Sequence, residues 1–166
     1  MNTEGEIQIR PATAADHVAI WDILQPIIRE GETFALPQEM GAEEAIGHWC
    51  GGDHDTYVAL IGAEILGTFY IRPNQMGGGS HISNAGYATA PTARGRGIAR
   101  TMCGYSLELA RQQGYRAMQF NFVVSTNHRA VALWESYGFE VLTRLSEAFL
   151  HPMLGYVDAL VMFREL

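Results

Sequence analysis

The sequence predicts a single mixed α/β domain over residues 1–166. Its length of 166 residues fits one domain with one good core, and 48% hydrophobic with 17% charged residues is a globular composition. Apolar runs of strand length alternate along the chain with stretches of helical periodicity. The expected order is strand, two helices, three strands, helix, strand, helix and two strands, which is typical of a sheet covered by helices.

The first two elements are a strand over residues 7–11 and a long helix. Isoleucines alternate with polar residues in the strand, and Pro11 stops it. Thr13 and Asp16 have the spacing of a capping box, with Asp in place of Glu, and apolar residues follow at helical spacing. Gly31 ends this helix.

The middle of the chain predicts a helix, a hairpin and a further strand. The helix spans residues 42–49 and stops at a glycine pair. Two β-rich apolar runs, 56–62 and 65–71, are joined by a tight turn and form the hairpin. The tract 73–79 is a flexible tip before a strand over 81–90.

The last third predicts two helices and three strands. Gly114 stops the first helix, Asn127 caps the second, and Gly138 ends it. The elements are a helix over 97–113, a strand over 117–124, a helix over 129–137, and strands over 139–145 and 156–163.

Composition also limits the partners. The net charge of −7 argues against nucleic-acid and membrane binding, which favour broad positive patches. Cys50 and Cys103 have no motif spacing, which predicts reduced thiols, and the six histidines have no paired ligand spacing, so no metal is expected. Without a leader or a long apolar run, we expect a soluble cytoplasmic protein.

Residues 94–100 predict a site for a phosphorylated cofactor. Two glycines allow close approach of the backbone, a helix starts here with its unpaired N–H groups, and three arginines add positive charge. A dinucleotide fingerprint needs a small residue where Arg100 stands, and a Walker loop needs a lysine, which this chain lacks.

Two motifs resemble the GCN5-related N-acetyltransferase (GNAT) superfamily. Arg94, Gly97 and Ala99 fill its acetyl-CoA signature, Arg/Gln-x-x-Gly-x-Gly/Ala, and residues 127–139 are similar to its second signature, Asn-x-x-Ala-x-x-Leu-Tyr-x-x-x-Gly-Phe. The resemblance covers essentially the whole chain. It implies a mostly antiparallel sheet of six to seven strands, a splayed pair of strands, and about four flanking helices.

A narrower resemblance points to the fungal azetidine-2-carboxylate N-acetyltransferases. It rests on segments 31–37, 79–87, 117–127 and 155–159. It implies direct acetyl transfer to a small amine or proline-like imino acid, and it favours a homodimer. Acetylation of a peptide or protein amine, and a CoA-sensing module without turnover, remain alternatives.

The GNAT resemblance implies the residues that contact acetyl-CoA. The strand before the loop would pair with the pantetheine arm, the loop amides would bind the pyrophosphate, and Asn127 would contact the pantetheine side or serve only as a helix cap. The expected contacts are Thr89, Arg94, Gly95, Arg96, Gly97, Ile98, Ala99, Arg100 and Asn127.

Asn84, Asn121 and Tyr87 are the expected catalytic residues. The two asparagines match the polar pair of the azetidine-2-carboxylate enzymes, although a pair of buried, backbone-satisfied asparagines is the alternative. Tyr87 lies on the strand whose amides would face the thioester oxygen. Thr33 and Phe34 would cover the substrate.

Trp134 would form a wall of the substrate pocket or belong to the core, and it also marks a departure from common family patterns. It occupies the position of a tyrosine that acts as an acid, and indole cannot do so. The strand over 82–87 lacks the usual glutamate. His81 is the nearest candidate base, with a solvated hairpin histidine as the alternative.

Overall fold

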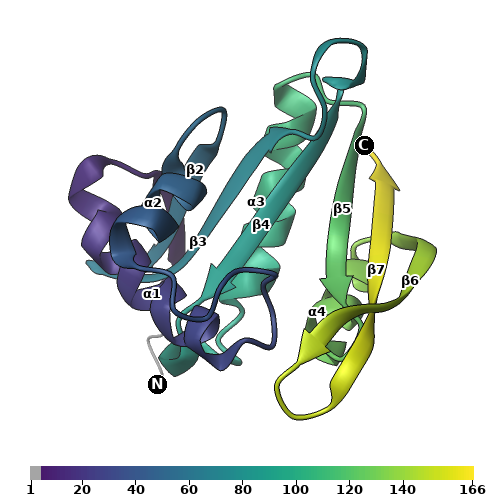
Figure 1. The fold of residues 1–166 in the computed structure, drawn as a ribbon. Helices are drawn as coiled ribbons and strands as arrows, with labels where there is room; N and C mark the ends of the chain where they lie inside the picture. The colour runs from purple at the N-terminus through teal and green to yellow at the C-terminus, as the bar shows by residue number, and fades with distance from the viewer. Residues whose placement is uncertain (1–4) are drawn as a thin grey trace.

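Seven strands and four α-helices occupy residues 5–166, the part of the chain that the computed structural model describes (Figure 1). The strands are β1 (Ile7–Pro11), β2 (Asp55–Ile61), β3 (Glu64–Pro73), β4 (Ile82–Thr89), β5 (Ala117–Val124), β6 (Glu140–His151) and β7 (Gly155–Glu165). The helices are α1 (His17–Glu30), α2 (Ala42–Cys50), α3 (Ile98–Gln112) and α4 (His128–Ser136). The predicted class and element order are confirmed.

All seven strands form one sheet in the order β1-β2-β3-β4-β5-β7-β6. Every neighbouring pair is antiparallel except β4 and β5, which are parallel and connected through α3. That parallel pair is short, because only Ile82 with Ala117 and Ser83 with Met118 are in register. Beyond these residues the two strands diverge into a V, as Figure 1 shows. The splayed pair implied by the resemblance is therefore present.

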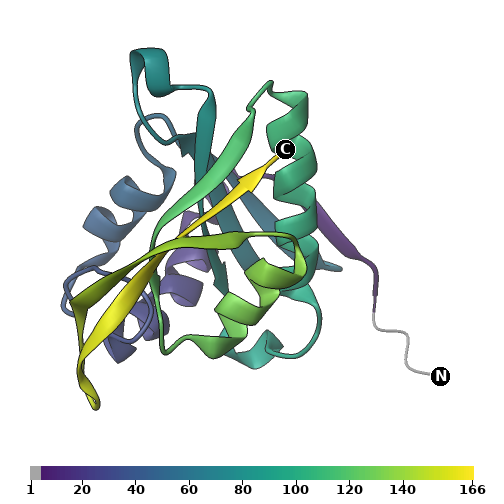
Figure 2. The same ribbon diagram turned by 90° about the vertical axis from the view of Figure 1, so that its right-hand side faces the viewer.

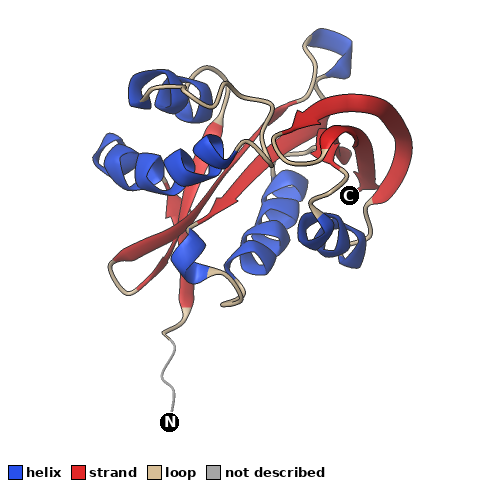
Figure 3. Ribbon diagram, turned by 60° about the horizontal axis from the view of Figure 1, so that its bottom comes forward, coloured by secondary structure: helices blue, strands red, loops and turns tan. Residues whose placement is uncertain are grey.

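The helices cover both faces of the sheet. Figures 2 and 3 show α1 and α2 on one face and α3 and α4 on the other. Helix α1 packs on β3 and β4, and α3 packs on the opposite side of the same strands. Each helix buries one apolar stripe, as its sequence period requires. The buried side chains of α1 are Ile20, Ile23, Leu24, Ile27 and Ile28.

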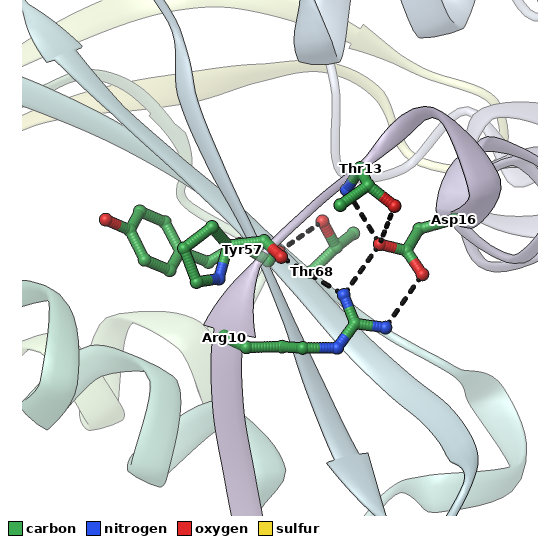
Figure 4. Close-up of polar contacts among 6 residues, drawn as sticks. Arg10, Thr13, Asp16, Tyr57 and Thr68 are labelled. Atoms are coloured by element: carbon green, nitrogen blue, oxygen red, sulfur yellow. Dashed lines mark hydrogen bonds and ion pairs between the residues drawn. The ribbon is translucent and has the colours of Figure 1, made fainter.

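A polar cluster fixes the start of the first helical segment (Figure 4). Asp16 accepts hydrogen bonds from the Thr13 backbone N–H at 2.8 Å and from the two Nη atoms of Arg10 at 2.7 and 2.9 Å. The guanidinium holds the pKa of the Asp16 carboxyl well below its usual range. We call Arg10, Thr13 and Asp16 the Arg10 cluster. The predicted capping box is confirmed.

The final hairpin is longer than its sequence pattern indicates. Strand β6 continues to His151, beyond the predicted end at residue 145. Its pairing with β7 shifts register between Leu145 and Phe149, and Glu147 has a positive φ of 51°. Such a bulge breaks the alternation of buried and exposed residues, so the continuation of the strand is invisible to a period-2 pattern.

Candidate functional site

The loop between β4 and α3 presents helix N–H groups that have no intrahelical acceptor. Gly95 and Gly97 both have φ of +79°, a left-handed conformation that glycine adopts without strain. The first helical hydrogen bond runs from the Thr101 N–H to the Gly97 carbonyl, at 3.0 Å. The N–H groups of residues 98–100 precede that bond, at the positive end of the helix dipole. This geometry suits an anion.

A cavity of about 830 Å³ opens beside this loop. It contains eight of the nine residues expected to contact the cofactor: Thr89, Arg94, Gly95, Gly97, Ile98, Ala99, Arg100 and Asn127. Arg96 is not among the lining residues. Its backbone N–H donates to the Ala93 carbonyl at 3.3 Å, so that amide closes the turn and does not point to a ligand.

The charged groups of this first cavity are only weakly paired. The nearest Arg94 and Glu30 side-chain atoms are 3.9 Å apart, and about half of each side chain is exposed. The Arg100 guanidinium lies 5.8 Å from the centre of the Tyr137 ring, and the Tyr137 hydroxyl donates to the Arg100 carbonyl at 2.8 Å. These contacts join the start of α3 to the end of α4 and leave both guanidinium groups beside the cavity.

A second cavity, of about 350 Å³, lies beside the splay of β4 and β5. Asn84 and Asn121 line it from the two diverging strands, and Trp49 and Tyr70 line it from α2 and β3. Six residues line both cavities, so the two spaces meet. They are Thr33, Phe34, Tyr87, Asn127, Ala130 and Trp134.

The two asparagines are held differently. The Nδ2 group of Asn84 donates to the Gln119 carbonyl at 3.0 Å and so bridges the strands where their backbone pairing stops. Asn121 is exposed; it accepts from Gln119 Nε2 at 3.0 Å and donates to Asn74 Oδ1 at 2.7 Å. The alternative of two buried asparagines satisfied by backbone is therefore wrong for Asn121. Their catalytic roles remain predictions.

Tyr87 and Trp134 pack together where the two cavities meet. Their ring centres are 4.8 Å apart, and Trp134 is only 8% exposed, so it is both a core residue and a pocket wall. Ser106 donates to the Cys103 carbonyl at 2.8 Å, so the Tyr87 hydroxyl, 2.6 Å away, donates to Ser106. Burial raises the pKa of Tyr87 well above its ordinary value, which disfavours proton release.

Asn127 caps α4 as its sequence position predicts. Its Oδ1 accepts from the Ala130 N–H at 3.3 Å. Because the residue also lines both cavities, its Nδ2 group can still bind a ligand. The cap is thus compatible with the cofactor role proposed by the resemblance.

Comparison with known proteins decides the family. The family model described as "Acetyltransferase (GNAT) family" matches residues 18–139. The chain belongs to the GNAT family. A solved GCN5-related N-acetyltransferase from Kribbella flavida is 41% identical, with a TM-score of 0.92 over 96% of this chain and 98% of that one.

Two further acetyltransferases are similar to this GNAT chain. N-acetyltransferase aca1 of Schizosaccharomyces pombe is 38% identical over 98 residues, which are 58% of this chain and 47% of that protein; the match spans about half the length of the relative. A phosphinothricin acetyltransferase from Sinorhizobium meliloti, solved in complex with AcCoA, is 20% identical with a TM-score of 0.85 over 96% of this chain and 88% of that one. At that identity the likeness extends to the fold alone.

The histidine placed to transfer a proton is not His81, the one expected from the sequence. His81 is exposed just before β4 and lines neither cavity. Among the described residues that line the second cavity, His48 carries the only imidazole. Tyr70 also lines it, but burial raises the pKa of that phenol. Imidazole is the side chain suited to proton transfer near neutral pH, so His48 replaces His81 as the candidate.

His151 lines the first cavity and also closes the β6–β7 turn. Its Nδ1 accepts from the backbone N–H groups of Met153 and Leu154 at 3.1 and 3.2 Å. The hydrogen of the neutral ring must then lie on Nε2, 3.9 Å from a Glu32 carboxylate oxygen. His151 therefore both closes the turn and forms part of the wall of the first cavity.

Sequence analysis missed a group beside the second cavity. Arg72 Nη1 lies 3.3 Å from His54 Nε2, and the His54 ring stacks on Tyr70 with the ring centres 4.1 Å apart. We call Arg72, His54 and Tyr70 the Arg72 cluster. One sequence signal points to this cluster: Arg72 follows Tyr70 by two positions, so if the strand predicted to end at residue 71 continues, both side chains lie on the same face.

The described part of the chain has neither a cluster of metal ligands nor a helix suited to crossing a membrane. Within residues 5–166, no group of three or more His, Cys, Asp or Glu side chains is placed to hold a metal ion. No helix in that range is long and apolar enough to span a membrane.

Proposed function

We propose that this protein is an acetyl-CoA-dependent N-acetyltransferase for a small amine or imino acid of the azetidine-2-carboxylate type. The observation that carries the proposal is the meeting of two cavities along the splay. The larger one begins at a loop suited to a diphosphate, and the smaller one ends among polar side chains. Two reactants can thus be held together in one complex, which is the main requirement of direct transfer.

The first cavity would bind acetyl-CoA. The N–H groups of residues 98–100 suit its pyrophosphate, and Arg94 and Arg100 add positive charge. Over residues 84–89, one edge of β4 has no strand partner, because pairing with β5 ends at Ser83. Backbone groups on that edge could pair with the pantetheine arm and stabilise the oxyanion that forms at the thioester carbon.

The second cavity would bind the amine. Its small volume and its cover, which includes Phe34 and Trp49 packed edge to face at 5.7 Å, favour a compact substrate over a peptide. Asn84 and Asn121 would contact the polar groups of a zwitterion, because carboxamides both donate and accept hydrogen bonds.

Proton transfer would use His48 and solvent. The attacking nitrogen must be neutral, and His48 would accept its proton, directly or through a water molecule. When the C–N bond forms and the C–S bond breaks, the sulfur leaves as a thiolate. Because the thiol pKa is about 8.5 and a helix N-terminus favours the negative charge, the thiolate can leave without a proton donor. A tyrosine at position 134, where this chain has tryptophan, is therefore not required.

The homodimer is also part of the proposal. Strand β6 is at the edge of the sheet, and its apolar side chains Val141, Leu142 and Leu150 are 42%, 56% and 62% exposed. An exposed apolar edge strand can pair with another chain, and an exposed apolar patch is typical of an interaction site. Sedimentation equilibrium should give twice the chain mass, and Leu142→Glu should shift it to the monomer.

Thiol release on mixing acetyl-CoA with amines tests the activity. We expect release with azetidine-2-carboxylate or proline analogues and none with a panel of peptides. Release only with peptides would support the peptide alternative. Tight acetyl-CoA binding in calorimetry with no release for any amine would support the CoA-sensing module instead.

A further inference from the structure

Arg72 does not line the second cavity itself, but it is a neighbour of residues that do. Its partner across the antiparallel β3–β4 pair is Asn84, so the two side chains are neighbours on one face of the sheet. Tyr70, two residues earlier on the same face, lines the cavity together with Asn84. A ligand in this cavity therefore lies within reach of a long arginine side chain.

No carboxylate within residues 5–166 forms an ion pair with Arg72. Its Nε is buried and is the only such side-chain nitrogen or oxygen without a hydrogen-bond partner in residues 5–166. Among the described residues, the arginines that form ion pairs are Arg10, Arg94, Arg111 and Arg144. Arg72 is only half-buried, but arginine stays charged, and a partly buried charge without a counter-ion is unfavourable. An anion would complete this environment.

His54 orients the guanidinium without neutralising it. The His54 Nδ1 lies 3.0 Å from the Trp49 carbonyl, which can only accept, so Nδ1 carries the hydrogen. The lone pair of Nε2 then accepts from Arg72 Nη1 at 3.3 Å. Burial, and to a lesser degree Arg72 itself, lowers the pKa of His54 and keeps this ring neutral.

We propose that Arg72 binds an anionic group of the amine substrate, beside Asn84, and so selects amines that carry a carboxylate close to the nitrogen. This inference rests on the proposed function, and it adds the residue that determines substrate charge. The cavity of about 350 Å³ leaves little room between the anion and the amine, which fits an amino or imino acid. Planar guanidinium groups bind carboxylates through paired hydrogen bonds.

The test compares two substrates of nearly the same size, one with a charged carboxylate and one with a neutral carboxamide. Azetidine-2-carboxylate and azetidine-2-carboxamide are acetylated by the wild type and by Arg72→Gln, which retains a donor for His54 but loses the charge. For the carboxylate, KM should rise about 10- to 100-fold in the variant. For the carboxamide the rise in KM should be several-fold smaller, because a neutral carbonyl oxygen accepts a hydrogen bond from Arg72 but forms no ion pair with it. The preference of the wild type for the carboxylate should disappear.

Two controls keep the outcomes distinct. Arg111→Gln removes the same charge from the exposed face of α3 and should leave both KM values unchanged. Arg72→Lys keeps the charge and should recover part of the preference. Equal increases in KM for both substrates, or no increase for either, would overturn the role of Arg72 while the activity stands. No thiol release by the wild type with either substrate would refute the proposed function itself.

Discussion

The Arg10 cluster and the Arg72 cluster place the same side chain in opposite situations. Arg10 donates two hydrogen bonds to one carboxylate, at 2.7 and 2.9 Å, and that carboxylate also accepts from a helix-capping residue (Figure 4). Arg72 has one longer contact, 3.3 Å to a neutral imidazole, and a buried Nε without a partner. The first cluster is complete within the protein, whereas the second has donors to spare.

This difference separates stability from function. A closed network lowers the free energy of the folded state and has nothing to offer a ligand. An incomplete network beside a cavity costs stability in the free protein and regains it when a complementary group binds. Arg10, Thr13 and Asp16 line neither cavity, while Arg72 neighbours a residue that lines the second one.

The largest expected effect is loss of stability in Asp16→Ala. The change leaves Arg10 without its carboxylate and removes the cap on Thr13, and it should lower the free energy of unfolding by about 2–3 kcal/mol. The value is below that of a fully buried pair because 43% of the Arg10 side chain is exposed. Urea unfolding measures it. A fall in kcat/KM of the folded variant would contradict the separation of the two clusters.

The second prediction concerns Asn84→Ala, a change beside the Arg72 cluster that should affect activity more than stability. It should lower kcat/KM for an imino acid by about 10- to 100-fold, since one or two substrate hydrogen bonds are lost. Acetyl-CoA affinity, measured by calorimetry, should stay within twofold. Asn84 also bridges β4 to Gln119, so a drop in stability that accounts for the entire loss of activity would return this residue to a structural role.

The sequence was sufficient for most of the architecture. Helix α1 follows from its apolar stripe and its Thr13–Asp16 box, and the anion-binding loop from glycines whose positive φ values the fold requires. These signals are local. The full length of β6 was missed because the bulge near Glu147 interrupts the alternation on which strand prediction depends.

The site was predictable where it coincides with motifs and unpredictable where it depends on register. The register of β3 and β4 places Arg72 next to Asn84 on one face of the sheet. The contact between Arg72 and His54 joins residues that are 18 positions apart in the sequence. His81 is the histidine nearest in sequence to the predicted substrate strand, yet it is His48, on α2, that lines the cavity. Side-chain partners over such distances follow from tertiary packing, which periodicity does not encode.

A smaller effect is expected from Gly86→Ala, which tests how firmly the Arg72 cluster is held. A methyl group at position 86 would lie 2.6 Å from the Tyr70 ring, the ring on which His54 stacks. We expect a loss of about 1–2 kcal/mol in unfolding free energy and a severalfold rise in KM for the carboxylate substrate. Gly47→Ala is the control, since space is open there and alanine favours the helix by about 0.5–1 kcal/mol. An unchanged KM in Gly86→Ala would show that Tyr70 does not position the cluster.

The smallest effects are in the pH dependence of stability, where the two clusters should differ in range. The folded-state pKa of Asp16 is depressed below the ordinary 3.8, so its contribution is present above that pH and is lost as the pH falls further; about 0.6 kcal/mol should be gone by pH 3.5. The pKa of His54 is also lowered, from an ordinary 6.5, so the unfolded state binds more protons and stability begins to fall below pH 6.5. Asp16→Asn should therefore flatten the wild-type curve only below about pH 3.8, and His54→Asn should flatten it just below pH 6.5. Urea unfolding at matched pH values gives both curves, and flattening of the same range by the two variants would show that the clusters are not independent.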